Sequence, residues 1–222
     1  MTRIALDAMG GDNAPGEIVV GAVESAVGLR GVKILLVGQL AAVQAELDKL
    51  PKDLKSDAQS AIESGKLEIV HAPDKVEMDE SPVDAVRKKK DCSINVAMRL
   101  VKDGRADAFV SAGNSGAVAT SAIFNLGRIP GVARPAIAAV LPTRIPRRPI
   151  LVLDAGANMD CHPDWLVQFA IMGNAYRVYE RLSLMENIPD DMKQMSLAIA
   201  RDVHEIKKDY NNEILLSDVI SS

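Results

Sequence analysis

The chain has 222 residues and a net charge of −4, and 48% of its residues are hydrophobic but only 3% aromatic. This length suffices for one large domain or two small ones, with a core built from Ala, Val, Leu, Ile and Met. The negative charge argues against a basic face that would bind nucleic acid, and two cysteines make no disulfide framework. The sequence shows neither a secretion signal nor an apolar run of the roughly 20 residues that cross a membrane. We therefore expect a reduced, cytoplasmic, globular protein.

Short apolar runs alternate along the chain with segments whose apolar residues are spaced three and four apart, as in helices. Helices are expected around Ile18–Ala26 and Val96–Val101. Strands separated by helices indicate βαβ units, and continuous apolar runs such as KILLVG and ILVLDAG are typical of strands buried on both faces. The pattern therefore predicts an α/β fold around a parallel sheet. The expected strands are Arg3–Asp7, Lys33–Val37, Leu67–His71, Ala108–Ser111, Ala136–Leu141 and Ile150–Asp154.

Residues 174–222 differ in composition from the rest, because they contain no glycine. Their apolar residues form a helical stripe from Ile188 to Ile206, and Asn187 and Pro189 suit the cap and first turn of a helix. We predict a long amphipathic helix, which either packs on the body of the protein or mediates dimerisation.

Three expected strands end in glycine-rich polar turns, in the stretches ALDAMGGDNAP, VSAGNSGAVATSAIF and VLDAGANMD. None of the turns has the P-loop or the dinucleotide-binding pattern, and each alone is an ordinary turn between a strand and a helix. Ligands bind beyond the carboxyl ends of parallel strands, where such turns expose backbone N–H groups to a phosphate or an oxyanion. Three of them in one sheet predict a functional cleft, with Asn13 as a possible cap of the first helix. The candidate ligand-binding residues are Asp7, Gly10, Gly11, Asn13, Ser111, Gly113, Asn114, Ser115, Gly116, Asp154, Asn158 and Asp160.

Positive charge comes from the stretch AVRKKKDCS, residues 85–93. It is either a solvated helix face or a phosphate site, and three consecutive lysines point around most of a helix, so at least one should face inward. The neighbouring cations could lower the pKa of Cys92 and make it a nucleophile, but we favour a packing role because it has no evident His partner. Asp154 and Asp160 could hold Mg²⁺, although hydrogen bonding and capping are the preferred roles. The three histidines are too scattered for a metal site, and no Ser-His-Asp arrangement is evident.

Five stretches, in this order and spacing, resemble the bacterial phosphate acyltransferase family of phospholipid synthesis, the PlsX family. They are RIALDAMGGDNAP, VRKKKDCS, FVSAGNSGA, RPAIAAVLPT and LVLDAGANMDCHPDWLVQFAIMG, which together cover most of residues 1–173. The resemblance implies an enzyme that makes acyl phosphate from acyl carrier protein thioester and inorganic phosphate, works as a homodimer, and needs no organic cofactor. It also implies a Rossmann-like α/β sandwich similar to isopropylmalate dehydrogenases.

The resemblance assigns roles to individual residues. Lys89 and Lys90 match the family's paired lysines and are expected to offset the charge of phosphate or of the transition state. The turn Asn114–Gly116 would donate to the oxyanion or the phosphate, and Asp7, Asn13, Asp154 and Asn158 would shape the crevice. Thiolate is a good leaving group, so positioning and electrostatics are expected to suffice without a protein nucleophile. Since acyl carrier proteins are acidic, the expected docking residues are basic, namely Arg87, Lys88, Arg144, Arg147 and Arg148.

The chain also departs from the family. Family members continue beyond the position of Gly173 with further strands, helices and a second glycine-rich region, which residues 174–222 do not resemble. PTRIPRRPI is basic where the family has a short glycine-containing turn, and Cys92 stands where serine is usual. We expect a truncated, fused or rearranged product of impaired activity, with an acyltransferase-like domain over 1–173 and a helical tail over 174–222. The family's membrane association depends on later segments and is not carried over.

Two other functions remain open from the sequence. One is a non-catalytic module that binds phosphate or a carrier protein, which acyl phosphate formation would separate from the enzyme. The other is a small relative of the dehydrogenases, which the missing dinucleotide fingerprint disfavours and a nucleotide titration would test.

Overall fold

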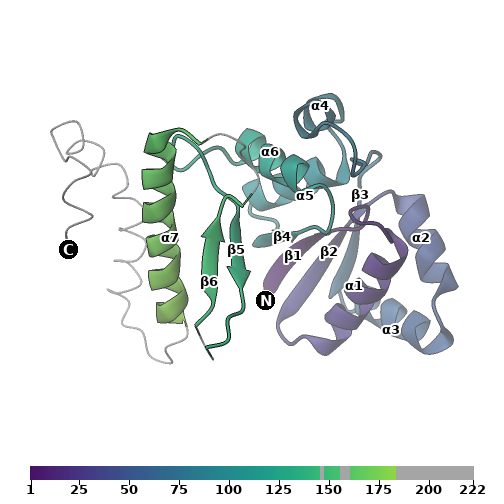
Figure 1. The fold of residues 1–222 in the computed structure, drawn as a ribbon. Helices are drawn as coiled ribbons and strands as arrows, with labels where there is room; N and C mark the ends of the chain where they lie inside the picture. Colours follow the sequence, from purple (N-terminus) through teal and green to yellow (C-terminus); the bar gives the residue numbers. More distant parts are fainter. Residues whose placement is uncertain (146–147, 156–160, 184–222) are drawn as a thin grey trace. The chain divides into compact units, whose positions relative to one another are not determined.

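The computed structural model describes residues 1–145, 148–155 and 161–183, and the chain divides into two compact units, Met1–Gly127 and Arg128–Ser222 (Figure 1). None of the described helices combines the length and the hydropathy that crossing a bilayer requires.

Within residues 1–127, all of which the structure describes, four parallel strands form one sheet in the order β3-β2-β1-β4. Their bounds lie within one residue of the predicted ones, so the prediction of a Rossmann-like α/β fold is confirmed for this unit. The strands are β1 (Thr2–Asp7), β2 (Val32–Gly38), β3 (Leu67–His71) and β4 (Ala108–Val110).

Helices connect these strands and cover both faces of the sheet (Figure 1). Alternate side chains of a strand point to opposite faces, so Leu36 of β2 packs with the helices α1, α2 and α3, whereas Leu35 and Val37 pack with α5. Burial of one such leucine stabilises the fold by roughly 1.5–3 kcal/mol. The helices are α1 (Gly16–Gly28), α2 (Leu40–Lys49), α3 (Lys52–Glu63), α4 (Pro82–Lys88), α5 (Ser93–Lys102) and α6 (Ser115–Asn125).

The strand order reverses at one place in this sheet. The chain moves outward from β1 through β2 to β3 and then returns to the other side of β1 to form β4. The carboxyl ends of β1 and β4 therefore lie side by side at a topological switch point, where ligands of open α/β sheets bind. Two of the three predicted turns follow these two strands.

The second unit contains β5 (Ala138–Leu141) and β6 (Ile150–Leu153), which pair antiparallel in a sheet of their own among the described residues. The prediction that these strands extend one parallel sheet is therefore wrong. Residues 142–149 join the two strands, and they are too few for the crossover of roughly a dozen residues or more that parallel strands need.

The helix α7 (Pro163–Ser183) contacts β6, and Gly173 allows this contact because a Cβ there would lie 2.7 Å from Leu153 Cδ1. The predicted boundary after Gly173 falls inside α7. The predicted stripe from Ile188 to Ile206 lies outside the described residues, so the helical tail stays a prediction.

An ion pair fastens the edge strand β4 to β1. Arg3 donates to Asp107 from its backbone N–H at 2.7 Å, from Nε at 3.1 Å and from Nη2 at 2.7 Å. These hydrogen bonds lower the pKa of the Asp107 carboxyl from 3.8 to about 2. Because the folded-state pKa is the lower one, the pair stabilises the fold above pH 3.8 and loses this effect as the pH falls through about 2.

We predict that Asp107→Asn removes this pH dependence. The difference in unfolding free energy between the unchanged protein and the variant should be largest above pH 3.8 and shrink toward pH 2, measured by urea unfolding followed by circular dichroism. A difference that stays constant from pH 6 to pH 2 would show that the Asp107 carboxyl has the same pKa in the folded and the unfolded protein.

Candidate functional site

The turns after β1 and β4 meet through a buried carboxylate. Asp7 ends β1 and is 1% exposed. Its Oδ2 accepts a hydrogen bond from Ser111 Oγ at 2.8 Å, and its Oδ1 accepts one from the backbone N–H of Met9 at 3.0 Å. A buried carboxylate needs such donors, and here they join the two turns that the sequence places at neighbouring strand ends.

Glycines let these two turns approach closely. A Cβ at Gly10 would lie 2.5 Å from Asp7 Oδ2, 2.8 Å from the Gly113 nitrogen and 2.9 Å from Ser111 Oγ. The Gly113 N–H in turn donates to Ser111 Oγ at 3.0 Å. The structure therefore brings Asp7, Gly10, Ser111 and Gly113 together, and their role in ligand binding stays a prediction.

The rest of the first turn differs from the prediction. Gly11 has a φ of +114°, which favours glycine, and lies against Ala112. Asn13 is exposed and does not cap α1, since the N-cap is Pro15 and no side chain among the described residues caps this helix. The capping prediction for Asn13 is therefore wrong, because the chain continues for two residues past Asn13 before the helix begins.

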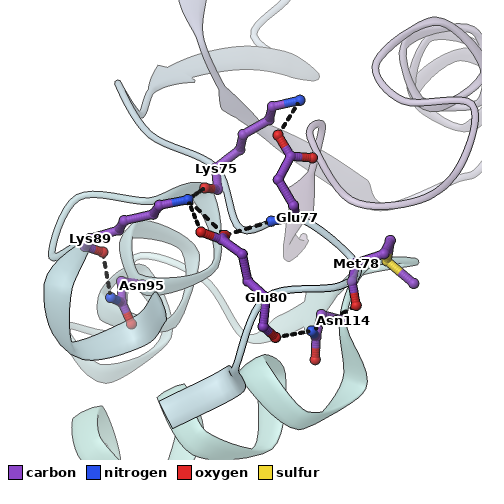
Figure 2. A network of polar contacts seen from close by, with 7 residues as sticks. All are labelled: Lys75, Glu77, Met78, Glu80, Lys89, Asn95 and Asn114. Atoms are coloured by element: carbon purple, nitrogen blue, oxygen red, sulfur yellow. Dashed lines mark hydrogen bonds and ion pairs between the residues drawn. The ribbon is translucent and has the colours of Figure 1, made fainter. Parts of the chain in front are cut away.

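Asn114 occupies the start of α6, and both ends of its amide are engaged (Figure 2). Its Oδ1 accepts from the backbone N–H of Ala117 at 3.0 Å, as an N-cap does. Its Nδ2 donates to the carbonyls of Met78 and Glu80 at 3.2 Å each. The side chain thus holds α6 and the loop before α4 together.

The same loop is held by Lys89, the C-cap of α4 (Figure 2). Lys89 Nζ lies 2.7 Å and 2.6 Å from the two carboxylate oxygens of Glu80, and it donates to the carbonyl of Lys75 at 2.9 Å. The hydrogen bond from Lys89, followed by that from the backbone N–H of Glu77, lowers the pKa of the Glu80 carboxyl, which therefore stays ionised. Lys89 is only partly buried, with its side chain 32% exposed, and it follows the end of α4, so the three lysines do not lie around one helix as expected.

A buried amide fixes the backbone of Lys89. Asn95 of α5 is 4% exposed, and its Nδ2 donates to the carbonyls of Val86 and Lys89 at 3.0 Å each. Its Oδ1 accepts from Ser121 Oγ of α6 at 2.7 Å and from Asn125 Nδ2 at 3.3 Å. This network joins α4, α5 and α6, so the end of α4 that carries Lys89 is anchored to the helix that begins at Asn114.

The other basic residues of this stretch lie at the surface. Lys90 is exposed and its carbonyl accepts from Arg99 Nη1 at 2.7 Å. Arg87 and Lys88 are also exposed, and the Arg87 guanidinium lies 5.3 Å from the centre of the Phe124 ring. Lys89 and Lys90 are therefore not an equivalent pair, since only Lys89 joins the network in Figure 2.

Ser115 and Gly116 form the first turn of α6. Ser115 is exposed, whereas a Cβ at Gly116 would lie 2.7 Å from Cγ of Pro82 in α4. A proline ring is rigid, so the packing of α4 against α6 explains this glycine without a ligand.

Cys92 behaves as a packing residue, as we favoured. Its side chain is 0% exposed and packs with Val86 and Ile94, and this burial raises the pKa of the thiol. The alternative of a thiol activated by neighbouring cations is contradicted, because the desolvation outweighs the effect of Arg99.

The remaining candidates belong to the second unit. Asp154 follows β6, which lies outside the four-stranded sheet, so the argument that three turns share one sheet edge does not extend to it. Asp154 has a φ of +59°, and its backbone N–H donates to Ile137 at 2.7 Å. Arg144 and Arg148 are exposed, and Arg147, Asn158 and Asp160 lie outside the described residues.

Sequence reasoning missed two residues of this site, Glu80 and Asn95. Glu80 lies nine positions before Lys89 in a loop, a separation that no periodic pattern marks. Asn95 had a usable signal, because it is a polar residue among the apolar positions of α5. The network connects the Lys89 ammonium group, through the Glu80 loop, to the Asn114 side chain at the start of α6.

Comparisons with known proteins agree with the motifs. The family model described as "Fatty acid synthesis protein" matches residues 2–186. A protein of Trichodesmium erythraeum named "Phosphate acyltransferase" is 54% identical over 175 residues, which cover 79% of this chain and 48% of that protein. Proteins with the same name from Nostoc sp. and Desulforamulus reducens are 45% and 53% identical, over 95% and 79% of this chain and 59% and 49% of their own lengths. The chain thus spans about half the length of the curated relatives it matches.

We predict that Gly10→Ala destabilises the fold by about 1–3 kcal/mol, since its methyl group would overlap Asp7 and the other turn. Gly21→Ala is the matched control, because Gly21 lies within α1 with no atom in reach of the added Cβ. That substitution should stabilise the fold by about 0.5–1 kcal/mol. Urea unfolding measures both, and equal effects of the two substitutions would contradict close packing of the turns.

We also predict that Cys92 is unreactive in the folded protein. In a Cys161→Ser background, the remaining thiol should react with Ellman's reagent at least about tenfold more slowly in buffer than in urea, because it is buried and little ionised. Equal rates in buffer and urea would restore the hypothesis of an activated thiol.

Proposed function

Because this chain belongs to the fatty acid synthesis protein family, we propose that it contributes to acyl transfer from a carrier protein thioester to inorganic phosphate. The relatives named above carry the name phosphate acyltransferase, and the chain matches about half of their length. The observation that carries the proposal is the partly buried Lys89, which the Glu80 loop and Asn95 connect to the Asn114 turn.

In the proposed reaction an oxygen of phosphate attacks the carbonyl carbon of the thioester. A C–O bond forms, the C–S bond breaks, and the thiolate leaves and takes up the proton that phosphate loses. A dianionic phosphate must approach a carbonyl that itself becomes an oxyanion, so fixed donors and positive charge stabilise the transition state. Lys89 would supply the charge, and the turn from Ser111 to Gly116 would supply backbone N–H groups. Asp7, Gly10 and Gly11 would shape the opposite turn.

Roles for the other candidate residues are also part of the proposal. Lys90 would attract phosphate from the surface, and Asp154, Asn158 and Asp160 stay candidate ligand-binding residues of the second unit. Arg87 and Lys88, with Arg144, Arg147 and Arg148, would dock an acidic carrier protein. Exposed cations steer association more than they add affinity, which suits a partner that must leave after each turnover.

The oligomeric state and location complete the proposal. We propose a homodimer in the cytoplasm, where acyl carrier protein is the partner. Light scattering coupled to gel filtration would reveal the dimer.

A second candidate function is a binding module without catalysis. It is favoured by the engagement of Lys89 and Asn114 with protein acceptors, since both side chains make the hydrogen bonds of ordinary structural residues. Such a protein would bind phosphate or a carrier protein and release no thiol.

The decisive measurement is thiol release from acyl carrier protein thioester by the 222-residue chain, with and without phosphate. We expect phosphate-dependent release, and we expect Lys89→Gln to lower kcat/KM on the order of 100-fold, as the loss of one charge-stabilising donor does. Lys90→Gln removes the same charge at the next position and should lower kcat/KM by less than about threefold, because the exposed Lys90 side chain would attract phosphate through water.

Three outcomes are informative. Release that needs no phosphate would indicate a thioesterase. Phosphate binding without release would favour the binding module. Equal losses in the Lys89 and Lys90 variants would remove the special role of Lys89.

A further inference from the structure

The Glu80 carboxylate already occupies a small anion site. Its two oxygens lie 2.7 Å and 2.6 Å from Lys89 Nζ, and Oε2 also accepts from the backbone N–H of Glu77 at 2.9 Å (Figure 2). An ammonium group and a backbone N–H aimed at one point are the donors that proteins use for phosphate oxygens.

We propose that the Glu80 carboxylate competes with inorganic phosphate for this anion site, which we call the phosphate seat. Inorganic phosphate binds by displacing the Glu80 carboxylate and takes over both donors, Lys89 Nζ and the Glu77 N–H. The inference rests on the proposed role of Lys89 as a phosphate ligand and adds the second donor and the group that must leave.

The groups that form the seat stay in place when Glu80 leaves. Asn95 holds the carbonyl of Lys89 from inside the protein, and the carbonyl of Lys75 keeps one of the three Nζ protons of Lys89. Asn114 holds the Glu80 carbonyl rather than its carboxylate. A rotation of the Glu80 side chain therefore opens the seat without moving the backbone or the end of α4.

Exchange of the Glu80 carboxylate for phosphate is also open to solvent and costs little free energy. The Lys89 and Glu80 side chains are each 32% exposed, so water screens their attraction and an anion can reach them. Phosphate carries more charge than a carboxylate and offers more acceptor oxygens. Removal of the Glu80 charge weakens its hold on both donors and removes its repulsion of the incoming anion.

The test compares two substitutions that change the charge equally within the same loop. Glu80→Gln should lower the Kd for inorganic phosphate by about three- to tenfold, as the loss of one competing, partly screened charge does. Asp79→Asn is the control, because Asp79 is exposed in the same loop and lies outside the network of Figure 2. It should change the Kd by less than about twofold. Calorimetry at constant ionic strength measures both, with chloride in place of phosphate as the blank.

A second measurement reads the seat without relying on turnover. A lysine acylating reagent followed by peptide mass spectrometry should label Lys89 faster in the Glu80→Gln variant than in the unchanged protein, and phosphate but not chloride should slow that labelling. Lys89→Gln in the Glu80→Gln background should abolish the gain in phosphate affinity. Together these results would support the seat.

Other results would overturn it and show which proposal fails. Phosphate binding that is weaker or unchanged in Glu80→Gln would mean that Glu80 positions Lys89 and does not compete with the ligand, whatever the turnover. Fast labelling of Lys89 that phosphate does not slow would mean that this is no phosphate seat. If thiol release stays phosphate-dependent in that case, the proposed reaction stands and phosphate binds elsewhere.

Discussion

The arrangement of the first unit depends on the burial of one charged group, the Asp7 carboxylate. A carboxylate that is 1% exposed must find donors inside the protein, and it finds Ser111 Oγ and the N–H of Met9. Because those donors come from the turns of two neighbouring strands, the carboxyl ends of β1 and β4 are brought together at the switch point. Gly10 and Gly113 follow from this contact, since a side chain at either position would fill the space that the hydrogen bonds need.

A second set of contacts extends this constraint to the cations. Asn114 begins α6 directly after the β4 turn, and it grips the loop whose Glu80 carboxylate pairs with Lys89. Asn95 of α5 completes this network, because its side chain binds the carbonyl of Lys89 and the hydroxyl of Ser121 in α6. The position of Lys89 is therefore fixed relative to the Asn114 turn through side chains of three helices, although no strand carries it.

The sequence was most informative where a pattern is local. Strand ends followed by Asp, Ser and Gly identified both turns of the switch point, and apolar runs predicted the bounds of β1 to β4 within one residue. It failed where geometry depends on distant partners. Glu80 has no periodic relation to Lys89. The ion pair forms because the loop before α4 brings Glu80 next to Lys89, the residue that follows α4. The antiparallel pairing of β5 and β6 was missed because apolar runs indicate strands but do not give their direction, which the short connection sets.

The exposure of the Lys89–Glu80 pair determines what it can do. Removing one partner of a fully buried ion pair costs roughly 3–5 kcal/mol of stability, because the remaining charge is left without a partner. A partly exposed pair contributes about 0–1 kcal/mol, since water solvates whichever partner is released. A lysine that exchanges its partner for a new anion therefore cannot be buried together with its counter-ion. A lysine without any partner would instead bind other protein acceptors, so a partner is also needed. The partly exposed position of Lys89 satisfies both requirements, so its structural contact with Glu80 and its proposed ligand-binding role are compatible.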